Sequence, residues 1–178
     1  MGVKGLALAW GFAEATLFFV VPEVLITWVA LERLRLAVAA SLWALLGALA
    51  GGALMFWWGA ARHDQALAAV ERVPAVSVEM LAEIEYSLGE HGPRAMIPGA
   101  FIGRPYKAYA VQSPAVGISP LAFLAASVPA RLVRFLLAAV VTGGCAHLLR
   151  RRPARRKRAV FVAFWVTLYA LFWTLVPG

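Results

Sequence analysis

The chain has few of the residues that build common catalytic and metal sites. It contains one cysteine and three histidines in 178 residues, so neither an intrachain disulfide nor a cysteine-based metal site is possible. The histidines have no metal-ligand spacing such as H-E-x-x-H, and neither a nucleophile elbow nor a phosphate-cradling loop occurs. We therefore expect no metal, no cofactor and no enzymatic activity.

Acidic residues are also scarce. Nine Asp and Glu stand against 17 Lys and Arg, which gives a formal net charge of +8. Most of this surplus comes from seven basic residues in the segment 150–158. Because the segment lies between two apolar stretches, it is typical of a cytoplasmic loop that touches anionic headgroups. We expect no nucleic-acid partner.

Apolar residues, in contrast, are abundant. They make up 62% of the chain, and the mean hydropathy is +0.78, whereas soluble domains are about 45–50% apolar. The uncharged runs 36–61, 108–130 and 159–178 reach or approach the ~20 residues that a helix needs to cross a bilayer. The composition predicts an all-α polytopic membrane protein with residues 1–178 in a single membrane domain.

Loop charges predict the topology. If the basic loop 150–158 is cytoplasmic, the transmembrane helix 119–148 runs inward, and a C-terminal transmembrane helix, 159–176, places the C-terminus outside. The linker 63–91 is rich in acidic residues and poor in basic ones, so it belongs outside. The transmembrane helix 36–60 then runs outward.

Two further apolar segments, 5–31 and 93–117, must then begin and end on the same face. Both contain helix breakers, and non-helical backbone at membrane depth survives only when it is buried in protein or faces water. We therefore expect two oppositely oriented re-entrant hairpins, with one kinked transmembrane helix as the alternative for the first. The expected breaks lie at Val20-Val21-Pro22 in the first segment and at Pro98, Gly99, Gly103, Pro105 and Pro114 in the second.

Each broken segment precedes a predicted transmembrane helix, which indicates an inverted repeat. Such repeats place substrate near the bilayer midplane, between broken helices. Between the two repeats, the apolar spacing of residues 77–88 predicts an interfacial amphipathic helix. Ser77 would cap this helix and Gly89 would end it.

Six charged residues lie within the apolar segments. Each costs at least about 2.5–3.5 kcal/mol at the bilayer centre, so we expect at least one of the acids to pair with a base. Arginine binds phosphate through a planar fork and lysine binds it as a point charge. The candidate substrate-binding residues are Arg104, Lys107, Arg131 and Arg134, and the candidate proton-coupling residues are Glu23 and Glu14.

These charges have structural interpretations as well. The bases could only lock the hairpins by pairing with the acids, and Arg131 and Arg134 could snorkel to an interface. Glu23, beside a helix break, is the better candidate for carrying a proton, because burial raises the pKa of a carboxyl group. A static ion pair is the alternative, and Glu14, in the middle of a helix, is the better candidate for pairing.

In this order, the motifs resemble the DedA family, whose members carry the SNARE-associated or VTT domain. The resemblance covers roughly residues 5–150. The residues that carry it are Glu14, Pro22-Glu23, Gly47-x3-Gly51, Phe56, Gly59, Glu90-His91-Gly92, Gly103-Arg104-Pro105-Tyr106-Lys107, Gly117, Phe123 and Arg131-Leu132-Val133-Arg134-Phe135.

The resemblance implies two re-entrant hairpins with transmembrane helices, a bacterial inner-membrane location and transport of lipids such as undecaprenyl phosphate or phospholipid. It also implies proton coupling in some members. This chain departs from the family pattern at Gly52, where an aspartate is common. It also has only Arg104-Pro105-x-Lys107 in place of paired arginines around a proline.

The function favoured by these observations is that of a flippase or scramblase for an anionic lipid, with membrane lipids and protons as partners. A structural or assembly membrane protein with a charged core is one alternative, and a proton-coupled small-solute exporter is another. Gly47 and Gly51 predict a close approach of helices, within one chain or across a homo-oligomer.

Overall fold

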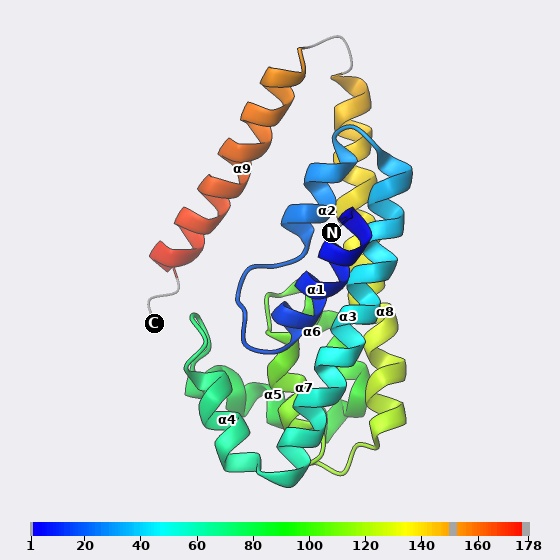
Figure 1. The fold of residues 1–178 in the computed structure, drawn as a ribbon. Helices are drawn as coiled ribbons and strands as arrows, with labels where there is room; N and C mark the ends of the chain where they lie inside the picture. The colour runs from blue at the N-terminus through cyan, green and yellow to red at the C-terminus, as the bar shows by residue number, and fades with distance from the viewer. Residues whose placement is uncertain (1, 150–152, 176–178) are drawn as a thin grey trace.

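The structure is a computed structural model that describes residues 2–149 and 153–175; the predicted basic residues Arg150, Arg151 and Arg152 lie outside these ranges. All regular structure within the described ranges is helical (Figure 1). The elements are α1 (Val3–Ala15), α2 (Glu23–Ala30), α3 (Leu34–Ala61), α4 (His63–Glu71), α5 (Val78–His91), the 3₁₀ helix η1 (Gly92–Ala95), α6 (Met96–Phe101), α7 (Tyr106–Gln112), α8 (Pro120–Leu148) and α9 (Ala154–Leu175).

Among the described residues, two helices, α3 and α8, are long and apolar enough to cross a membrane. They have 28 and 29 residues, and they match the predicted segments 36–60 and 119–148 closely. The two helices pack against each other and run in opposite directions (Figure 1). Together they form the axis around which the shorter helices are arranged.

The first broken segment consists of two short helices. α1 ends at Ala15 and α2 begins at Glu23, so residues 16–22 are non-helical. The break is therefore longer than Val20-Val21-Pro22 and begins at Thr16, whose hydroxyl binds the carbonyl groups of the last turn of α1. Pro22 is the N-cap of α2, a place where its missing N–H costs little.

The second broken segment is interrupted between α6 and α7. Gly103 in this break has a φ of 83°, which favours glycine, and Pro105 is the N-cap of α7. The predicted breaks at Pro98 and Gly99 are wrong, because both residues are helical. Pro98 lies in the first turn of α6, where an N–H is not needed, and Gly99 lets the Tyr109 ring approach the helix backbone.

Glycines allow α1 and α3 to pack closely. A Cβ atom on Gly47 would collide with the backbone of Leu8, and one on Gly51 would collide with the backbone of Phe12. Gly11 has the same relation to the backbone of Ala44 in the opposite direction. The predicted close approach at Gly47 and Gly51 is therefore made within one chain.

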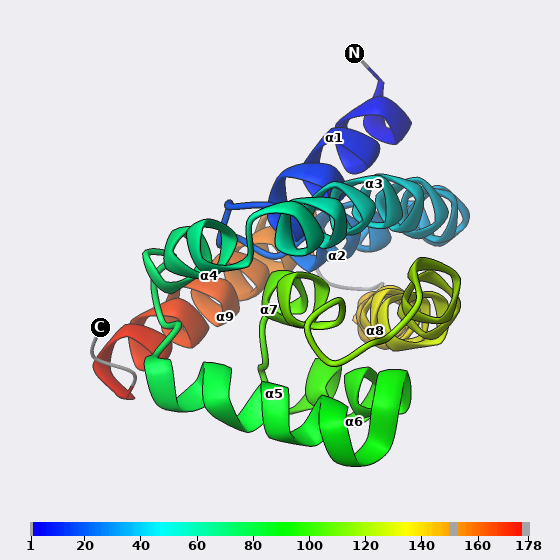
Figure 2. The ribbon, with the colours of Figure 1, turned by 90° about the horizontal axis from the view of Figure 1, so that it is seen from below.

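The linker contains two helices, α4 and α5. Ser77 caps α5 as predicted, because its hydroxyl accepts a hydrogen bond from the N–H of Met80. The predicted end at Gly89 is wrong: α5 continues to His91 and ends at Gly92, which has a φ of 59°. The apolar face of α5 is buried, and α7 lies between α5 and α3 (Figure 2).

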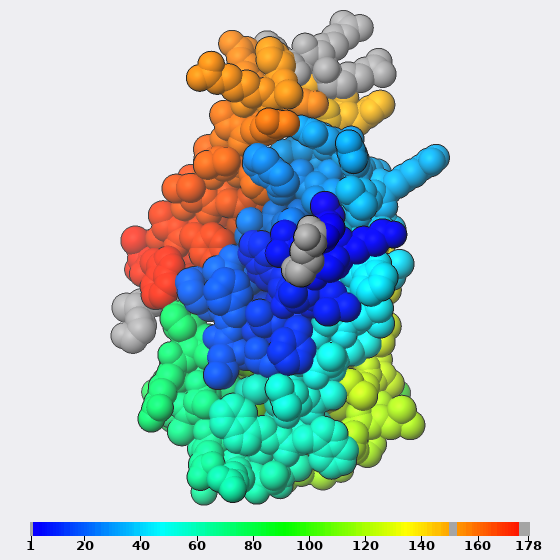
Figure 3. Space-filling view, in the orientation of Figure 1, coloured from blue at the N-terminus to red at the C-terminus, as the bar shows by residue number. Residues whose placement is uncertain are grey.

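The last helix, α9, lies along one side of the molecule (Figure 3). Its side chains contact the break between α1 and α2 and the helix α2: Tyr169 accepts a hydrogen bond from the N–H of Val21, and Trp165 donates one to Thr27. Near its N-terminus, Arg158 pairs with Glu32 at 2.5 Å. This pairing lowers the pKa of the Glu32 carboxyl, first through the hydrogen bond from Arg158 and then through its charge.

Large apolar side chains are exposed on three helices. A water-soluble monomer rarely exposes a contiguous apolar patch larger than a few hundred Å², so this surface is typical of contact with lipid. The exposed residues include Leu42, Trp43, Leu46, Leu54 and Trp57 on α3, Leu121, Val133, Leu137, Val140 and Val141 on α8, and Val160, Phe164, Val166, Leu171 and Trp173 on α9.

Candidate functional site: a charged cavity between α1, α7, α8 and α9

Glu14 and Arg131 form a buried ion pair between α1 and α8. Both oxygens of the Glu14 carboxylate accept hydrogen bonds from the guanidinium group, one of them at 3.3 Å from Nη1. The side chains are 8% and 3% exposed, respectively. Two-point contact of this kind orients both groups as well as neutralising them. The expectation that at least one of the acids pairs with a base is confirmed here.

Glu23 and Arg134 form a second ion pair, between α2 and α8. Arg134 lies one helical turn after Arg131, as their spacing predicts. Its Nη1 atom also donates a hydrogen bond of 3.1 Å to the carbonyl oxygen of Ala100 in α6. One arginine therefore connects both broken segments.

The Glu23 carboxylate makes fewer hydrogen bonds than the carboxylate of Glu14. It is 8% exposed, yet neither of its oxygens has a hydrogen-bond partner among the described residues. Its contact with Nε of Arg134 has the closeness of an ion pair but not the geometry of a hydrogen bond. Among the described residues, the charge of Glu23 is therefore offset by the ion pair with Arg134 and by no hydrogen bond.

Arg104 and Lys107 lie on either side of the N-cap of α7. Arg104 is partly exposed and pairs with the exposed Glu83 of α5 at 2.9 Å. Lys107 is 3% exposed and donates a hydrogen bond of 2.7 Å to the carbonyl oxygen of Phe18. Within the described ranges Lys107 has no carboxylate at ion-pair distance. It is therefore a buried cation whose direct partner is a neutral carbonyl group.

Side chains from other elements bind the non-helical backbone of residues 16–22. Besides the bond from Lys107 to Phe18, Trp10 donates to the carbonyl oxygen of Val20 at 2.9 Å. The N–H of Val21 donates to the hydroxyl of Tyr169 at 3.2 Å. A non-helical segment in an apolar setting needs such partners, because water is not available to its backbone.

The four predicted bases line one cavity of about 170 Å³, together with Glu14. Glu23 does not line it but reaches it through Arg134. Glu14 pairs with Arg131, Glu23 with Arg134 and Glu83 with Arg104. The positive surplus of the site is therefore the charge of Lys107, and a positive surface attracts an anion. The remaining lining residues are Phe19, Val21, Val73, Pro74, Ala75, Val76, Gly103, Pro105, Tyr106 and Phe172.

Several hydrogen-bond donors of the arginines remain unused. Nε of Arg131 and both Nε and Nη2 of Arg134 are buried and make no hydrogen bond within the described ranges. Buried donors usually find a partner, and an unmade bond of this kind costs about 1–3 kcal/mol. Nε of Arg134 already contacts Glu23, so Nε of Arg131 and Nη2 of Arg134 are the donors left for an oxygen-rich anion.

Tyr106 is a site residue that sequence reasoning did not assign. Its ring lies under the guanidinium group of Arg131 at 4.8 Å, and its hydroxyl donates to Ser127 at 2.9 Å. A Cβ atom on Gly52 would collide with this tyrosine, so its ring fills the space beside the position where the resembled family often has an aspartate. The signals in the sequence were its position next to Lys107 and its place in the motif Gly103-Arg104-Pro105-Tyr106-Lys107.

Comparison of the chain with family models, with curated proteins and with solved structures found no significant match.

Proposed function

We propose that this protein moves an anionic lipid, such as a polyprenyl phosphate or a phospholipid, between the leaflets of a membrane. The phosphate would bind in the charged cavity, near Lys107 and the unused guanidinium donors of Arg131 and Arg134. The single observation that carries the proposal is the buried cation of Lys107, which lines this cavity beside three arginines and has no carboxylate at ion-pair distance among the described residues. The resemblance to the DedA family points to the same substrate class.

An apolar pocket beside the cavity favours a lipid over a free anion. This pocket, of about 390 Å³, lies between the first break and α9. Phe19, Val21 and Phe172 line both the pocket and the charged cavity. A phosphate with a hydrocarbon tail could therefore place its charge among the bases and its tail against aromatic side chains.

We propose further that the segments 5–31 and 93–117 are oppositely oriented re-entrant hairpins within an inverted repeat. Supporting this, α1 has 13 residues and α2 has eight, which correspond to about 20 Å and 12 Å. Both lengths are less than the hydrocarbon thickness of ~30 Å. Each broken segment is followed by a long helix, and the two long helices run in opposite directions (Figure 1).

The topology can be tested by labelling single cysteines in a Cys145→Ala background. Cysteines at positions 4 and 33 should react from the cytoplasmic side, and those at 90 and 118 from the outside. This is the arrangement expected in a bacterial inner membrane with the C-terminus outside. Labelling of the two members of a pair from opposite sides would remove the inverted repeat from the proposal.

Proton coupling through Glu23 is part of the same proposal. Its carboxylate has no hydrogen bond among the described residues, so protonation would release Arg134 without breaking a hydrogen-bond network. Arg134 could then bind the headgroup. Glu14, with two hydrogen bonds to Arg131, is the residue we assign to holding the fold.

A structural membrane protein is the second candidate, and the buried Glu14–Arg131 pair favours it. This pair joins residues 117 positions apart in the chain and would hold α1 on α8 whether or not a ligand binds. In that case loss of activity in any variant would follow loss of stability.

The experiment that separates the two candidates is lipid exchange in proteoliposomes. Fluorescent phospholipid or polyprenyl phosphate is incorporated, and its movement between leaflets is followed for wild type, Lys107→Gln and Arg94→Gln. Arg94 is an exposed cation that does not line the cavity, so it is the matched control. We expect Lys107→Gln to lose exchange while Arg94→Gln keeps it, at similar thermal stability. Equal exchange in all three proteins would overturn the transport proposal.

A further inference from the structure

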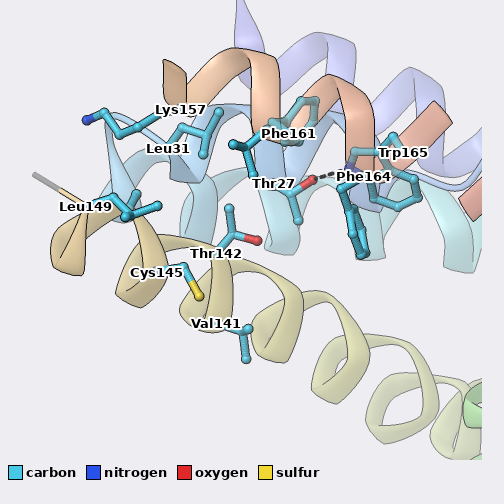
Figure 4. A pocket seen from close by; sticks show the side chains of 12 residues that line it. Thr27, Leu31, Val141, Thr142, Cys145, Leu149, Lys157, Phe161, Phe164 and Trp165 are labelled. Carbon is cyan, nitrogen blue, oxygen red and sulfur yellow. Dashed lines mark hydrogen bonds between the residues drawn. The ribbon is translucent and has the colours of Figure 1, made fainter. Parts of the chain in front are cut away.

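A second apolar groove, distinct from the charged cavity, lies between α2, α8 and α9 (Figure 4). Its volume of about 250 Å³ exceeds the ~150 Å³ of an engineered apolar cavity that binds benzene. The groove is lined by Thr27, Leu31, Val141, Thr142, Cys145, Ala146, Leu149, Lys157, Val160, Phe161, Phe164 and Trp165. Its lining is therefore largely hydrocarbon and aromatic.

The two ends of the groove differ in character. Lys157 lies at one end, and Trp165 lies at the other, where it donates a hydrogen bond of 3.2 Å to Thr27 (Figure 4). From residue 157 to residue 165, α9 rises by about 12 Å. One leaflet of the hydrocarbon region is about 15 Å thick, half of the ~30 Å bilayer core. The groove thus has roughly the length of one acyl chain within one leaflet.

The charged end is complementary to an anionic headgroup. Lys157 is half-buried at the groove, and the exposed Arg155 and Arg156 belong to the same helical turn. Arg158 is already paired with Glu32. Basic residues beside membrane helices attract anionic lipid headgroups, and pockets of this kind between helices bind them.

We propose that this groove binds an anionic glycerophospholipid, with its phosphate beside Lys157 and one acyl chain along Phe161, Phe164 and Trp165. Charge complementarity at one end and chain length along the groove argue for this occupant. A polyprenyl chain would extend far beyond Trp165 and fits the groove less well. The site does not depend on lipid transport, because it shares no residue with the charged cavity.

The only cysteine of the chain provides the test. Cys145 is exposed and lines the groove, so an acyl chain in the groove should shield it from a maleimide. The alkylation rate of the full-length wild-type protein in detergent micelles would be measured as phosphatidylglycerol, phosphatidylcholine or polyprenyl phosphate is added. We expect phosphatidylglycerol to protect at the lowest concentration.

Variants show whether Lys157 binds the headgroup. Lys157→Ala should raise the phosphatidylglycerol concentration needed for protection by about fivefold. Arg155→Ala, which removes a charge from the same turn but not from the groove, should change it much less. As a second measurement, bimane attached to Cys145 should be quenched by phosphatidylglycerol with brominated acyl chains.

The outcomes decide the proposal. Equal protection by phosphatidylcholine, or an equal effect of the two substitutions, would mean that the groove contacts any lipid without selecting an anionic headgroup. Either result would overturn the proposal. Protection by polyprenyl phosphate but not by phosphatidylglycerol would overturn the proposal that the groove holds the acyl chain of a glycerophospholipid. Absence of both protection and quenching would mean that no chain occupies the groove.

Discussion

Glu14 and Arg131 lie in α1 and α8, yet their side chains meet in a two-point ion pair that is almost completely buried. The Tyr106 ring lies against one face of the guanidinium group, and the Phe135 ring lies within 5.0 Å of it. The pair therefore anchors the first broken segment to the helix that also carries Arg134. Both residues of the pair also line the charged cavity, so a substitution at either one would change the fold and the proposed binding site together.

Removing one partner of this pair should strongly destabilise the protein. Glu14→Gln and Arg131→Met each leave a buried charge without its partner, which typically costs about 3–5 kcal/mol. The double variant Glu14→Gln, Arg131→Met should recover most of that loss, because neither charge remains. Thermal unfolding of the four proteins in one detergent measures the coupling. If the single losses simply add, the two residues do not act as a pair.

Replacing Glu23 should remove the pH dependence of transport. Glu23→Gln preserves shape, but a neutral amide cannot release a proton, so exchange in proteoliposomes should lose its dependence on pH. The variant also leaves Arg134 without its counter-ion, so we expect a lower melting temperature, and exchange is compared per amount of folded protein. A fully active variant with an unchanged pH profile would exclude proton coupling at Glu23 and leave the lipid-binding proposal intact.

Gly47 should be intolerant of any side chain. Gly47→Ala places a methyl group against the backbone of Leu8, and overpacking of this kind typically costs about 1–3 kcal/mol. Gly144→Ala is the matched control, because a Cβ atom there would meet nothing within 4 Å. Replacing such a helical glycine by alanine stabilises the folded protein by up to about 1 kcal/mol, because alanine favours the helix more than glycine does. In detergent, the melting temperature should therefore fall for Gly47→Ala and rise for Gly144→Ala. Equal shifts in the two variants would contradict the packing of α1 on α3.

The ion pair between Glu32 and Arg158 should stabilise the attachment of the α9 N-terminus at neutral pH and lose this effect at low pH. The pKa of Glu32 lies below its ordinary value because Arg158 donates a hydrogen bond and attracts its charge. The stabilisation is therefore complete above the ordinary pKa and is lost as the pH falls through the lowered one. In an NMR titration, Arg158→Gln should raise the pKa of Glu32 toward its ordinary value. Arg156→Gln should have a smaller effect, and an unchanged pKa in Arg158→Gln would show that the ion pair is absent in solution.

Much of this architecture could be predicted from the sequence because it depends on local patterns. The length and apolar composition of their segments predict α3 and α8, although the uncharged run 108–130 ends before Arg131 and Arg134 of α8. The Ser77 cap was correctly predicted because a hydroxyl before an amphipathic run satisfies a free N–H nearby in the chain. The predicted C-terminal end of α5 and the predicted breaks at Pro98 and Gly99 were wrong. A glycine or proline can remain helical when its position in a turn or a packing partner permits it.

The candidate site shows where local patterns stop being informative. By itself, the sequence determined that six charges in apolar segments needed partners or a polar cavity, because an isolated charge there is costly. Only the tertiary structure decided that Glu14 pairs with Arg131, Glu23 with Arg134 and Arg104 with Glu83. It also decided that Lys107 and Tyr169 bind the backbone of the first break. These choices depend on which helices pack together, and that packing arises from contacts between residues far apart in the chain.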